Sequence, residues 1–232
     1  MSANTIAGMH REKAPDTYFS NTNQNLVDHF PDKPGRILDI GCAEGRLGEA
    51  IIAQKHPEHY TGIEVVPDVA ESAKTRLHEV LTGEAEHWLP TLPDHSYDWI
   101  ILADSLEHTI DPWGVMKQVN RLLKPGGQLL VSIPNVRNLG VIQDLMVGGK
   151  WTYRPFGIMD QGHLRFFTRS SILKLLTDEG FSIRQCYSNP RNRWKKLFGK
   201  FISRLLSLLI LQPGAYEEFI TVQWIIIAEK TR

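Results

Sequence analysis

RILDIGCAEGRLG, residues 36–48, is the stretch of sequence that decides the fold. Residues 37–40 form a short apolar run with β-branched side chains, which predicts a buried strand. From Leu47 onward the apolar residues recur at helical spacing, so a helix is expected after a turn. Gly41 and Gly45 lie in that turn, where a residue without a Cβ can take a positive φ and lets a ligand lie against the backbone. The segment therefore predicts a strand, a glycine-rich turn and a helix, with a cofactor at the turn.

The spacing around the turn favours one kind of ligand. The N-terminus of the helix offers unpaired N–H groups and a partial positive charge. The glycines read G-x-x-x-G-x-x-G, unlike the G-x-G-x-x-G of dinucleotide-binding proteins. Asp39, two residues ahead of Gly41, would repel a pyrophosphate and attract a cationic amine. S-adenosylmethionine carries an amine, a sulfonium and a ribose diol but no phosphate, so it suits this turn. A tight turn with no ligand is the alternative that this segment alone leaves open.

Composition limits the class of protein. With 232 residues and 42% hydrophobic content, the chain can form one substantial α/β core but not two full domains. The formal net charge is zero, so no basic field recruits nucleic acid and no such partner is expected. Cys42 and Cys186 provide neither a disulfide framework nor a zinc cluster. The first residues lack the apolar core of a signal peptide, and a cytoplasmic protein is expected.

Apolar runs alternate with helical patterns along the rest of the chain. Further strands are predicted at 60–64, 80–82, 96–102, 128–133, 181–187 and 220–229. Strands that alternate with helices predict an α/β fold, a doubly wound and mostly parallel seven-stranded sheet of the Rossmann-like kind. Residues 1–15 are expected to be a flexible N-terminus, and 16–232 a single domain that begins with a helix over 16–30.

Acidic residues close two of the predicted strands. Glu64 ends the second strand about 25 residues past Asp39, near the ~20-residue interval at which such a unit presents an acid to ribose hydroxyls. We therefore expect Glu64 to bind a ribose, with a solvated strand-end charge as the alternative. Ala103 and Asp104 follow the fourth strand, and open α/β sheets place ligands and chemistry at the carboxyl ends of strands.

An irregular segment over 136–168 is expected to cover the substrate. It is rich in aromatic and turn residues, and loops carry recognition while a sheet holds position. Transfer to an oxygen acceptor needs a base that titrates near neutrality, which favours histidine. His108 follows the fourth strand and is the first candidate, while His163 lies in the cover and is the second. Each could instead brace a loop. No P-loop, Ser-His-Asp order or H-x-x-x-H pattern occurs, so no metal is expected.

Residues 191–211 combine basic and apolar side chains at helical spacing. A basic amphipathic helix of this kind can lie at the inner face of a membrane. Packing on the sheet, or on a second subunit in a homodimer, is the other interpretation. The apolar run over 205–211 is far shorter than the ~20 residues that span a bilayer.

Several strings together resemble the class I S-adenosylmethionine-dependent methyltransferases. The general set is DIGCAEG at 39–45, Glu64 and KPGG at 124–127. A narrower set resembles a bacterial subgroup associated with cell-surface glycan assembly: DSLEH at 104–108, SIPN at 132–135, WTY at 151–153 and GHLRFFT at 162–168.

The resemblance implies a place for each site residue. Asp39 and Gly41 would lie near the methionine end of the cofactor, within a loop that also includes Cys42, Ala43 and Gly45. Glu64 would bind the ribose, and Glu84, where the family usually has Asp, the adenine amino group. Ala103 and Asp104 would lie beside the sulfonium. Together with the two histidines chosen above from their positions, the expected catalytic residues are Asp104, His108 and His163. Cys42 stands where many members have glycine and is expected to narrow the loop slightly. The last strand is expected to pair antiparallel with the sixth.

The expected function is S-adenosylmethionine-dependent O-methylation of a sugar or lipid-linked glycan. Two alternatives remain open at this point. One is O-methylation of a small aromatic or quinone-like acceptor, which an aromatic cover would serve equally. The other is a non-catalytic binding module that keeps the cofactor fold as a scaffold.

Overall fold

The computed structural model describes residues 24–189 and 215–231. The expected flexible N-terminus at 1–15 and the basic amphipathic segment at 191–211 lie outside the described residues. The same is true of the first part of the helix expected over 16–30. Its described part contains one short helix, α2 (Gln24–Val27), whose Leu26 and Val27 are buried.

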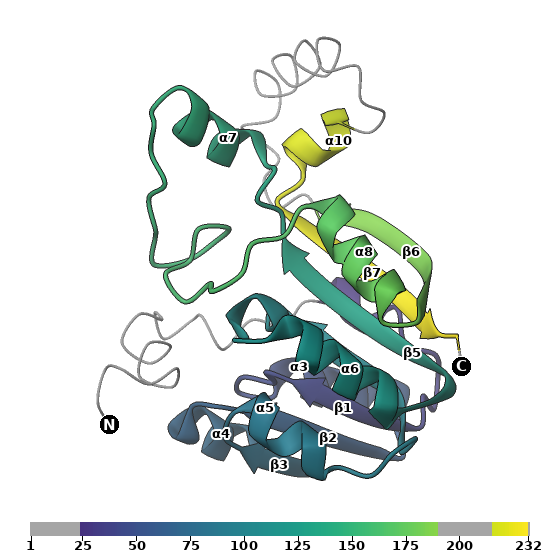
Figure 1. Cartoon of the computed structure of the whole chain (residues 1–232). Helices are drawn as coiled ribbons and strands as arrows, with labels where there is room; N and C mark the ends of the chain where they lie inside the picture. Colours follow the sequence, from purple (N-terminus) through teal and green to yellow (C-terminus); the bar gives the residue numbers. More distant parts are fainter. Residues whose placement is uncertain (1–23, 190–214, 232) are drawn as a thin grey trace.

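Seven strands form a single sheet in the order β3-β2-β1-β4-β5-β7-β6 (Figure 1). Strands β1 to β5 run parallel, and β7 lies antiparallel between β5 and β6. This confirms the predicted doubly wound sheet and its antiparallel last strand. The strands are β1 (Arg36–Ile40), β2 (His59–Glu64), β3 (Glu79–Thr82), β4 (Tyr97–Ala103), β5 (Leu123–Pro134), β6 (Phe181–Asn189) and β7 (Gln223–Lys230).

Helices cover both faces of the sheet because alternate strand residues point to opposite sides. In β1, Leu38 and Ile40 join a core with α6 and α8, whereas Ile37 joins a core with α2 and α3. The helices are α3 (Arg46–Lys55), α4 (Pro67–Ala73), α5 (Ala85–Trp88), α6 (Pro112–Leu122), α7 (Leu139–Met146), α8 (Arg169–Asp178) and α10 (Ala215–Ile220), with short 3₁₀ turns η1 (Leu89–Thr91) and η2 (Leu106–His108). The result is a three-layer fold with a core on each side of the sheet.

Local signals in the sequence explain where two of these helices begin. The Asp111 carboxylate accepts a hydrogen bond from the Gly114 N–H at 3.0 Å, and proline occupies the first turn of α6. Thr168 caps α8 by accepting from the Ser171 N–H, and the Ser171 hydroxyl accepts from the Thr168 N–H in return.

The last strand begins later than the sequence predicts. Residues 215–220 form α10, and β7 begins only at Gln223. The Thr221 hydroxyl donates to the Glu217 carbonyl at 2.7 Å, and the Asn135 amide donates to the Glu218 and Thr221 carbonyls at 2.7 and 3.0 Å. These bonds satisfy the carbonyls that a helix end leaves unpaired, so a helix rather than a strand precedes β7.

The segment over 136–168 contains α7 and then a long run without regular helix. Figure 1 shows it on the side toward which the arrow of β5 points. It returns to the sheet through a bridge between Asn135 and Phe167. The segment therefore lies at the edge of the sheet where the parallel strands end. Among the described helices, none is long and apolar enough to cross a membrane.

Candidate cofactor and acceptor site

The sheet order places the glycine turn at a topological switch point. Strand β1 has β2 on one side and β4 on the other, so the connections from β1 and β4 leave in opposite directions. Ligands of open α/β sheets bind at the carboxyl ends of strands at such a point. Asp39, Glu64 and Asp104 all lie at or near the carboxyl ends of these three strands.

Asp39 is buried, with only 1% of its surface exposed. Its Oδ2 accepts a hydrogen bond from the Tyr60 hydroxyl at 2.7 Å, whereas Oδ1 has no hydrogen-bond partner in the described part of the chain. Burial raises the pKa of Asp39 to about 7, and the bond from Tyr60 offsets only part of that effect. A buried acceptor without a donor fits the cationic amine of S-adenosylmethionine.

Ser105 brings a second unpaired polar atom to the same edge. Gly41 has a φ of +81°, and a Cβ on it would lie 2.7 Å from the Cβ of Ser105. Glycine is therefore required there both by the backbone and by the close approach of the loop after β4. The Ser105 hydroxyl oxygen is buried and, within 24–189 and 215–231, has no partner.

Glu64 connects the end of β2 to the glycine turn. Its two oxygens accept the N–H groups of Val66 at 2.8 Å and of Ala43 at 3.0 Å. Burial raises the pKa of Glu64, and these backbone hydrogen bonds act in the opposite direction. A carboxylate oxygen has more than one lone pair, so the same group can accept from the hydroxyls of a ribose. Ala43 has a positive φ of 49°, a conformation that the bond to Glu64 helps to hold.

Cys42 does not narrow the glycine turn, contrary to the expectation. Its side chain is buried, and its Sγ would lie 2.5 Å from a Cβ on Gly62 of β2. The thiol therefore fills the space that Gly62 leaves open, while Gly45, with a φ of +78°, is the residue immediately before α3.

Two further predicted cofactor residues lie at strand ends. Glu84 is exposed at the start of α5, just beyond β3. Ala103 is half-buried and is the last residue of β4, where it pairs with Ser132 of β5. Both positions agree with the edge of the sheet that holds Asp39 and Glu64.

Asp104 is held in an unusual conformation. Its backbone has a φ of +54°, which residues other than glycine rarely adopt. Its N–H donates to the Ser132 carbonyl at 3.0 Å. The Asp104 Oδ1 accepts from the Ser132 hydroxyl at 2.9 Å and from the side-chain amide of Gln223. The orientation of this exposed carboxylate is therefore set by β5 and β7.

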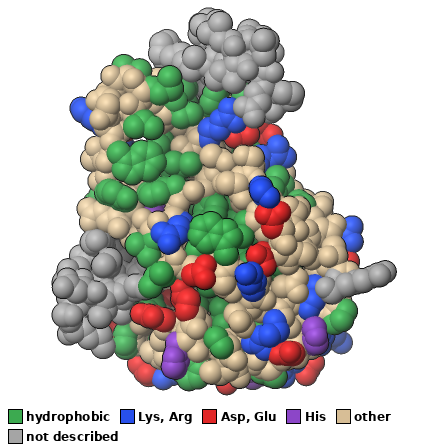
Figure 2. All heavy atoms as spheres, in the orientation of Figure 1, with side chains coloured by type: hydrophobic (Ala, Val, Ile, Leu, Met, Phe, Trp, Pro, Cys, Tyr) green, Lys and Arg blue, Asp and Glu red, His purple; other side chains and the backbone are tan. Residues whose placement is uncertain are grey.

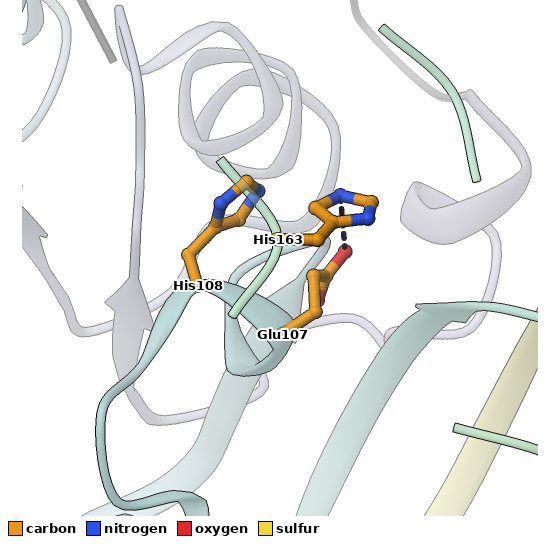
Figure 3. A group of neighbouring side chains, drawn as sticks. All are labelled: Glu107, His108 and His163. Carbon is orange, nitrogen blue, oxygen red and sulfur yellow. Dashed lines mark ion pairs between the residues drawn. The ribbon is translucent and has the colours of Figure 1, made fainter. Parts of the chain in front are cut away.

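The two candidate histidines lie together, as expected, and Glu107 joins them (Figure 3). The rings of His108 and His163 are T-shaped with centroids 4.7 Å apart. The Nε2 of His163 is 3.7 Å from Oε1 of Glu107, and its Nδ1 is 3.0 Å from the Ile158 carbonyl oxygen. The Nδ1 of His108 is 3.0 Å from the Gly162 carbonyl oxygen.

Burial distinguishes the two histidines. His163 is buried, and burial lowers its pKa, while both of its ring nitrogens face protein groups. His108 is only half-buried. It is therefore better placed than His163 to meet an acceptor.

Glu107 is the surprising member of this cluster. It is 1% exposed, neither carboxylate oxygen has a hydrogen-bond partner among the residues described, and burial raises its pKa well above the usual value. Ligand-type atoms of Glu107, His108 and His163 lie within 4.8 Å of one another, so these three could hold a metal ion. The sequence indicates both histidines but not Glu107, because the burial of this carboxylate depends on the fold.

Aromatic rings of the cover adjoin the histidines. Phe166 lies 5.1 Å from Trp151, 6.1 Å from Tyr153 and 6.1 Å from His163, measured between ring centroids. Trp151 and Tyr153 remain exposed. A flat, apolar acceptor could therefore stack on these rings with a hydroxyl near His108.

Comparison with known proteins agrees with this geometry. The family described as a methyltransferase domain matches residues 10–185. The ubiquinone biosynthesis O-methyltransferase of Aeromonas salmonicida strain A449 is 30% identical over 176 residues, which cover 70% of this chain and 71% of the relative. An S-adenosylmethionine-dependent methyltransferase from Archaeoglobus fulgidus has the same fold, with a TM-score of 0.67 at 18% identity over 93% of this chain and 97% of that one.

The fold alone does not fix the chemistry, since the [4+2]-cyclase SpnF also shares it, with a TM-score of 0.60 at 21% identity over 89% of this chain and 79% of that one. The family match, together with the unpaired Asp39 oxygen and the glycine turn, identifies the chemistry more closely than the fold does. An enzyme is therefore favoured over the non-catalytic binding module that the sequence left open. The chain belongs to the methyltransferase domain family and is an S-adenosylmethionine-dependent methyltransferase.

Proposed function

We propose that this enzyme methylates a hydroxyl oxygen of a small aromatic or quinone-like acceptor. The relatives that are about 30% identical are named ubiquinone biosynthesis O-methyltransferases, which favours this acceptor over the glycan put first from the sequence. The observation that carries the proposal is the aromatic cover itself. Rings of the cover reach His163, which in turn contacts His108 at the strand ends.

The chain's own residues hold the cofactor in this proposal. S-adenosylmethionine supplies a methyl group on a sulfonium, and its transfer is an in-line displacement. Asp39 would accept from the amine through its unpaired Oδ1, and Glu64, whose Oε2 also accepts from the Ala43 N–H, would accept from the ribose hydroxyls. Glu84 would accept from the adenine amino group, and Ala103 and Asp104 would lie beside the sulfonium. Positioning of this kind can supply about 7–11 kcal/mol of a barrier.

His108 acts on the acceptor. Its Nδ1 donates to the Gly162 carbonyl, which fixes the tautomer in which Nε2 is the basic nitrogen. This nitrogen would take the proton of the acceptor hydroxyl while the oxygen bonds to the methyl carbon, the carbon–sulfur bond breaks and S-adenosylhomocysteine leaves. A base in this role typically contributes a factor of about 10²–10⁴. His163 holds the ring of His108 in place by edge contact and closes the cover.

An acceptor panel tests the proposal. The protein is incubated with S-adenosylmethionine carrying a labelled methyl group and with hydroxylated benzoates, hydroxylated benzoquinones, sugar nucleotides or lipid-linked oligosaccharides. We expect label on an oxygen of the aromatic acceptors. Label on the glycans alone would overturn the proposal in favour of the glycan function.

A pair of variants tests the role of His108. We expect His108→Ala to reduce turnover by about 10²–10⁴ with unchanged affinity for S-adenosylhomocysteine. His87→Ala removes an exposed histidine of α5 and is the matched control, with turnover close to the parent. Equal loss of turnover and cofactor affinity in His108→Ala would show that the residue is structural.

A further inference from the structure

A line of polar side chains crosses the carboxyl edge of the sheet and ends at Asp104. Asn189 of β6 pairs with Gln223 of β7, Gln223 pairs with Pro134 of β5, and Ser132 of β5 pairs with Ala103 of β4. Four adjacent strands thus contribute to one network. It begins at the outer strand of the sheet and reaches the loop that carries the candidate site.

The hydrogen bonds of this network have a direction. The Asn189 amide donates to the Gln223 Oε1 at 3.0 Å, so the Gln223 Nε2 must face the other way. That nitrogen donates to the Ser132 Oγ at 2.9 Å and to the Asp104 Oδ1. The Ser132 hydroxyl donates to the same Oδ1 at 2.9 Å. A flipped amide would point its carbonyl oxygen at a carboxylate, which is repulsive.

In this network, two buried side chains orient the exposed carboxylate of Asp104. Gln223 and Ser132 are 8% and 1% exposed, whereas Asp104 is exposed. Both donors bind Oδ1, and Asp104 Oδ2 makes no hydrogen bond to the described residues. The positive φ of Asp104 is a strained conformation of the kind that persists at functional sites. Buried polar groups that serve only stability would be expected to satisfy one another rather than orient a surface carboxylate.

Asp104 also lies next to the cofactor turn. Its neighbour Ser105 comes so close to Gly41 that a Cβ there would be 2.7 Å from the Ser105 Cβ. Asp104 therefore lies at the edge of the sheet where the proposed function places the sulfonium. A fixed negative charge beside a sulfonium stabilises the cation without reorganising when it binds.

We propose that Gln223, oriented by Asn189, is a positioning residue that aims the Asp104 carboxylate at the sulfonium and so makes the site prefer a cation at that position. The inference rests on the proposed placement of Asp104 beside the sulfonium. Gln223 contacts neither the cofactor nor the acceptor and acts only through Asp104.

The test compares two cofactor analogues and needs no acceptor. S-adenosylhomocysteine has a neutral thioether, and sinefungin carries an ammonium group where the sulfonium methyl lies. The ratio of their dissociation constants therefore measures how strongly the site favours a cation there. We expect Gln223→Met to reduce the preference for sinefungin by about five- to tenfold, less than the loss of a direct hydrogen bond to a charged group because Gln223 acts through Asp104, while affinity for S-adenosylhomocysteine stays unchanged.

Matched variants separate the possible outcomes. Gln185→Met changes an exposed glutamine of neighbouring β6 and should leave the ratio as in the parent. Asp104→Asn should remove the preference, and adding Gln223→Met to it should change nothing more. Asn189→Leu should give a smaller loss in the same direction, because the Gln223 amide is then free to turn.

The results distinguish the role of Gln223 from the placement of Asp104. An unchanged ratio in Gln223→Met, with Asp104→Asn effective, overturns the role of Gln223. An unchanged ratio in Asp104→Asn overturns the placement of Asp104 itself. Equal weakening of both analogues by Gln223→Met would show a merely structural role. If Gln223→Met fails to fold, Gln223→Glu is measured instead. The introduced carboxylate should repel the carboxylate of Asp104, move it away from the sulfonium position and so reduce the preference for sinefungin.

Discussion

At the scale of single residues, Asp39 combines burial with the task of binding a cation. Its pKa of about 7 means that the carboxyl is neutral below that pH and ionised above it. A cationic amine binds the ionised form, so cofactor affinity should rise as the pH passes through about 7. We expect S-adenosylhomocysteine to bind about tenfold more weakly at pH 6 than at pH 8, because the ionised fraction changes by about that factor.

Calorimetric titration at several pH values measures this effect. Buffers with different ionisation enthalpies also count the protons released, and binding near pH 7 should release a fraction of one proton. Asp39→Asn keeps an acceptor for the Tyr60 hydroxyl but has no charge. Its affinity should be low and independent of pH. An affinity of the parent that stays flat between pH 6 and pH 8 would contradict this account of Asp39.

Cys42 and Gly62 form a complementary pair. A Cβ at position 62 would lie 2.5 Å from the Cys42 Sγ and 2.8 Å from Leu77 Cδ1. We expect Gly62→Ala to reduce the unfolding free energy by about 1–3 kcal/mol, the usual range for overpacking. In a Cys42→Ala background the loss should be smaller, because one of the two clashes is gone. Urea unfolding of the four proteins in this cycle measures the coupling, and additive losses would contradict the proposed contact.

The site residues differ in how far the sequence reveals them. The places of Asp39, Glu64 and Asp104 could be predicted because each lies at or next to the end of a strand that the sequence indicates. Tyr60 and Ser105 could not, because each acts on a residue from another strand or loop, and neighbours across a parallel sheet are distant in sequence. Gln223 is an extreme case, since its partner Asp104 is 119 positions away.

At the scale of elements, two asparagine side chains, Asn135 and Asn138, tie the segment after β5 to the end of α10 and the residues before β7. Asn135 is fully buried, donates to the Glu218 and Thr221 carbonyls, and accepts from the Arg137 N–H at 3.1 Å. The same residue therefore anchors the entry to the cover and the end of α10. The sequence predicted the strands on both sides of this joint but not α10, because it placed the start of the last strand at 220, within the segment that the structure forms as a helix.

We expect Asn135→Ala to lower the unfolding free energy by about 1–3 kcal/mol. The substitution removes the Asn135 donor from the buried Glu218 carbonyl, whereas the Thr221 carbonyl keeps a hydrogen bond from the Asn138 amide at 2.9 Å, and one unsatisfied buried group costs about 1–3 kcal/mol. Urea unfolding followed by circular dichroism measures the loss. Gln143→Ala, at an exposed site on α7, is the control and should stay within about 0.5 kcal/mol of the parent. A parent-like Asn135→Ala would show that other groups hold this joint.

At the scale of the whole molecule, apolar side chains from the exposed part of the cover gather on one face. Figure 2 shows hydrophobic side chains in the upper left, in the region where Figure 1 draws α7 and the loop after it. The exposed apolar residues of this segment are Leu145, Met146, Val147, Trp151, Tyr153 and Phe156. The sheet is covered on both faces, so this face owes its character to the inserted segment rather than to the shared fold.

The stability of the whole molecule without cofactor should also depend on Asp39. Between about pH 4 and pH 7 the folded chain keeps a proton on Asp39 that the unfolded chain has lost, because the folded pKa is about 7 and the ordinary value is 3.8. The contribution of this group to the unfolding free energy therefore falls as the pH rises through that window, by at most about 1.4 kcal/mol per pH unit. Glu64 and Glu107, whose pKa values are also raised by burial, act in the same direction, and His163, whose pKa is lowered by burial, acts in the opposite one.

A difference measurement isolates the part that belongs to Asp39. The unfolding free energies of the parent and of Asp39→Asn are compared by urea titration from pH 5 to pH 8. We expect the variant to gain stability relative to the parent as the pH rises to about 7, and the gain to level off above it. Asp28→Asn changes an exposed carboxylate in the turn after α2, and its unfolding free energy should follow that of the parent at every pH. Saturating S-adenosylhomocysteine should add stability to the parent, most of all above pH 7, because the bound amine then compensates the buried charge. A difference between parent and Asp39→Asn that stays constant with pH would mean that this carboxyl is ionised throughout the range, and that the cofactor amine meets a charge the fold already stabilises.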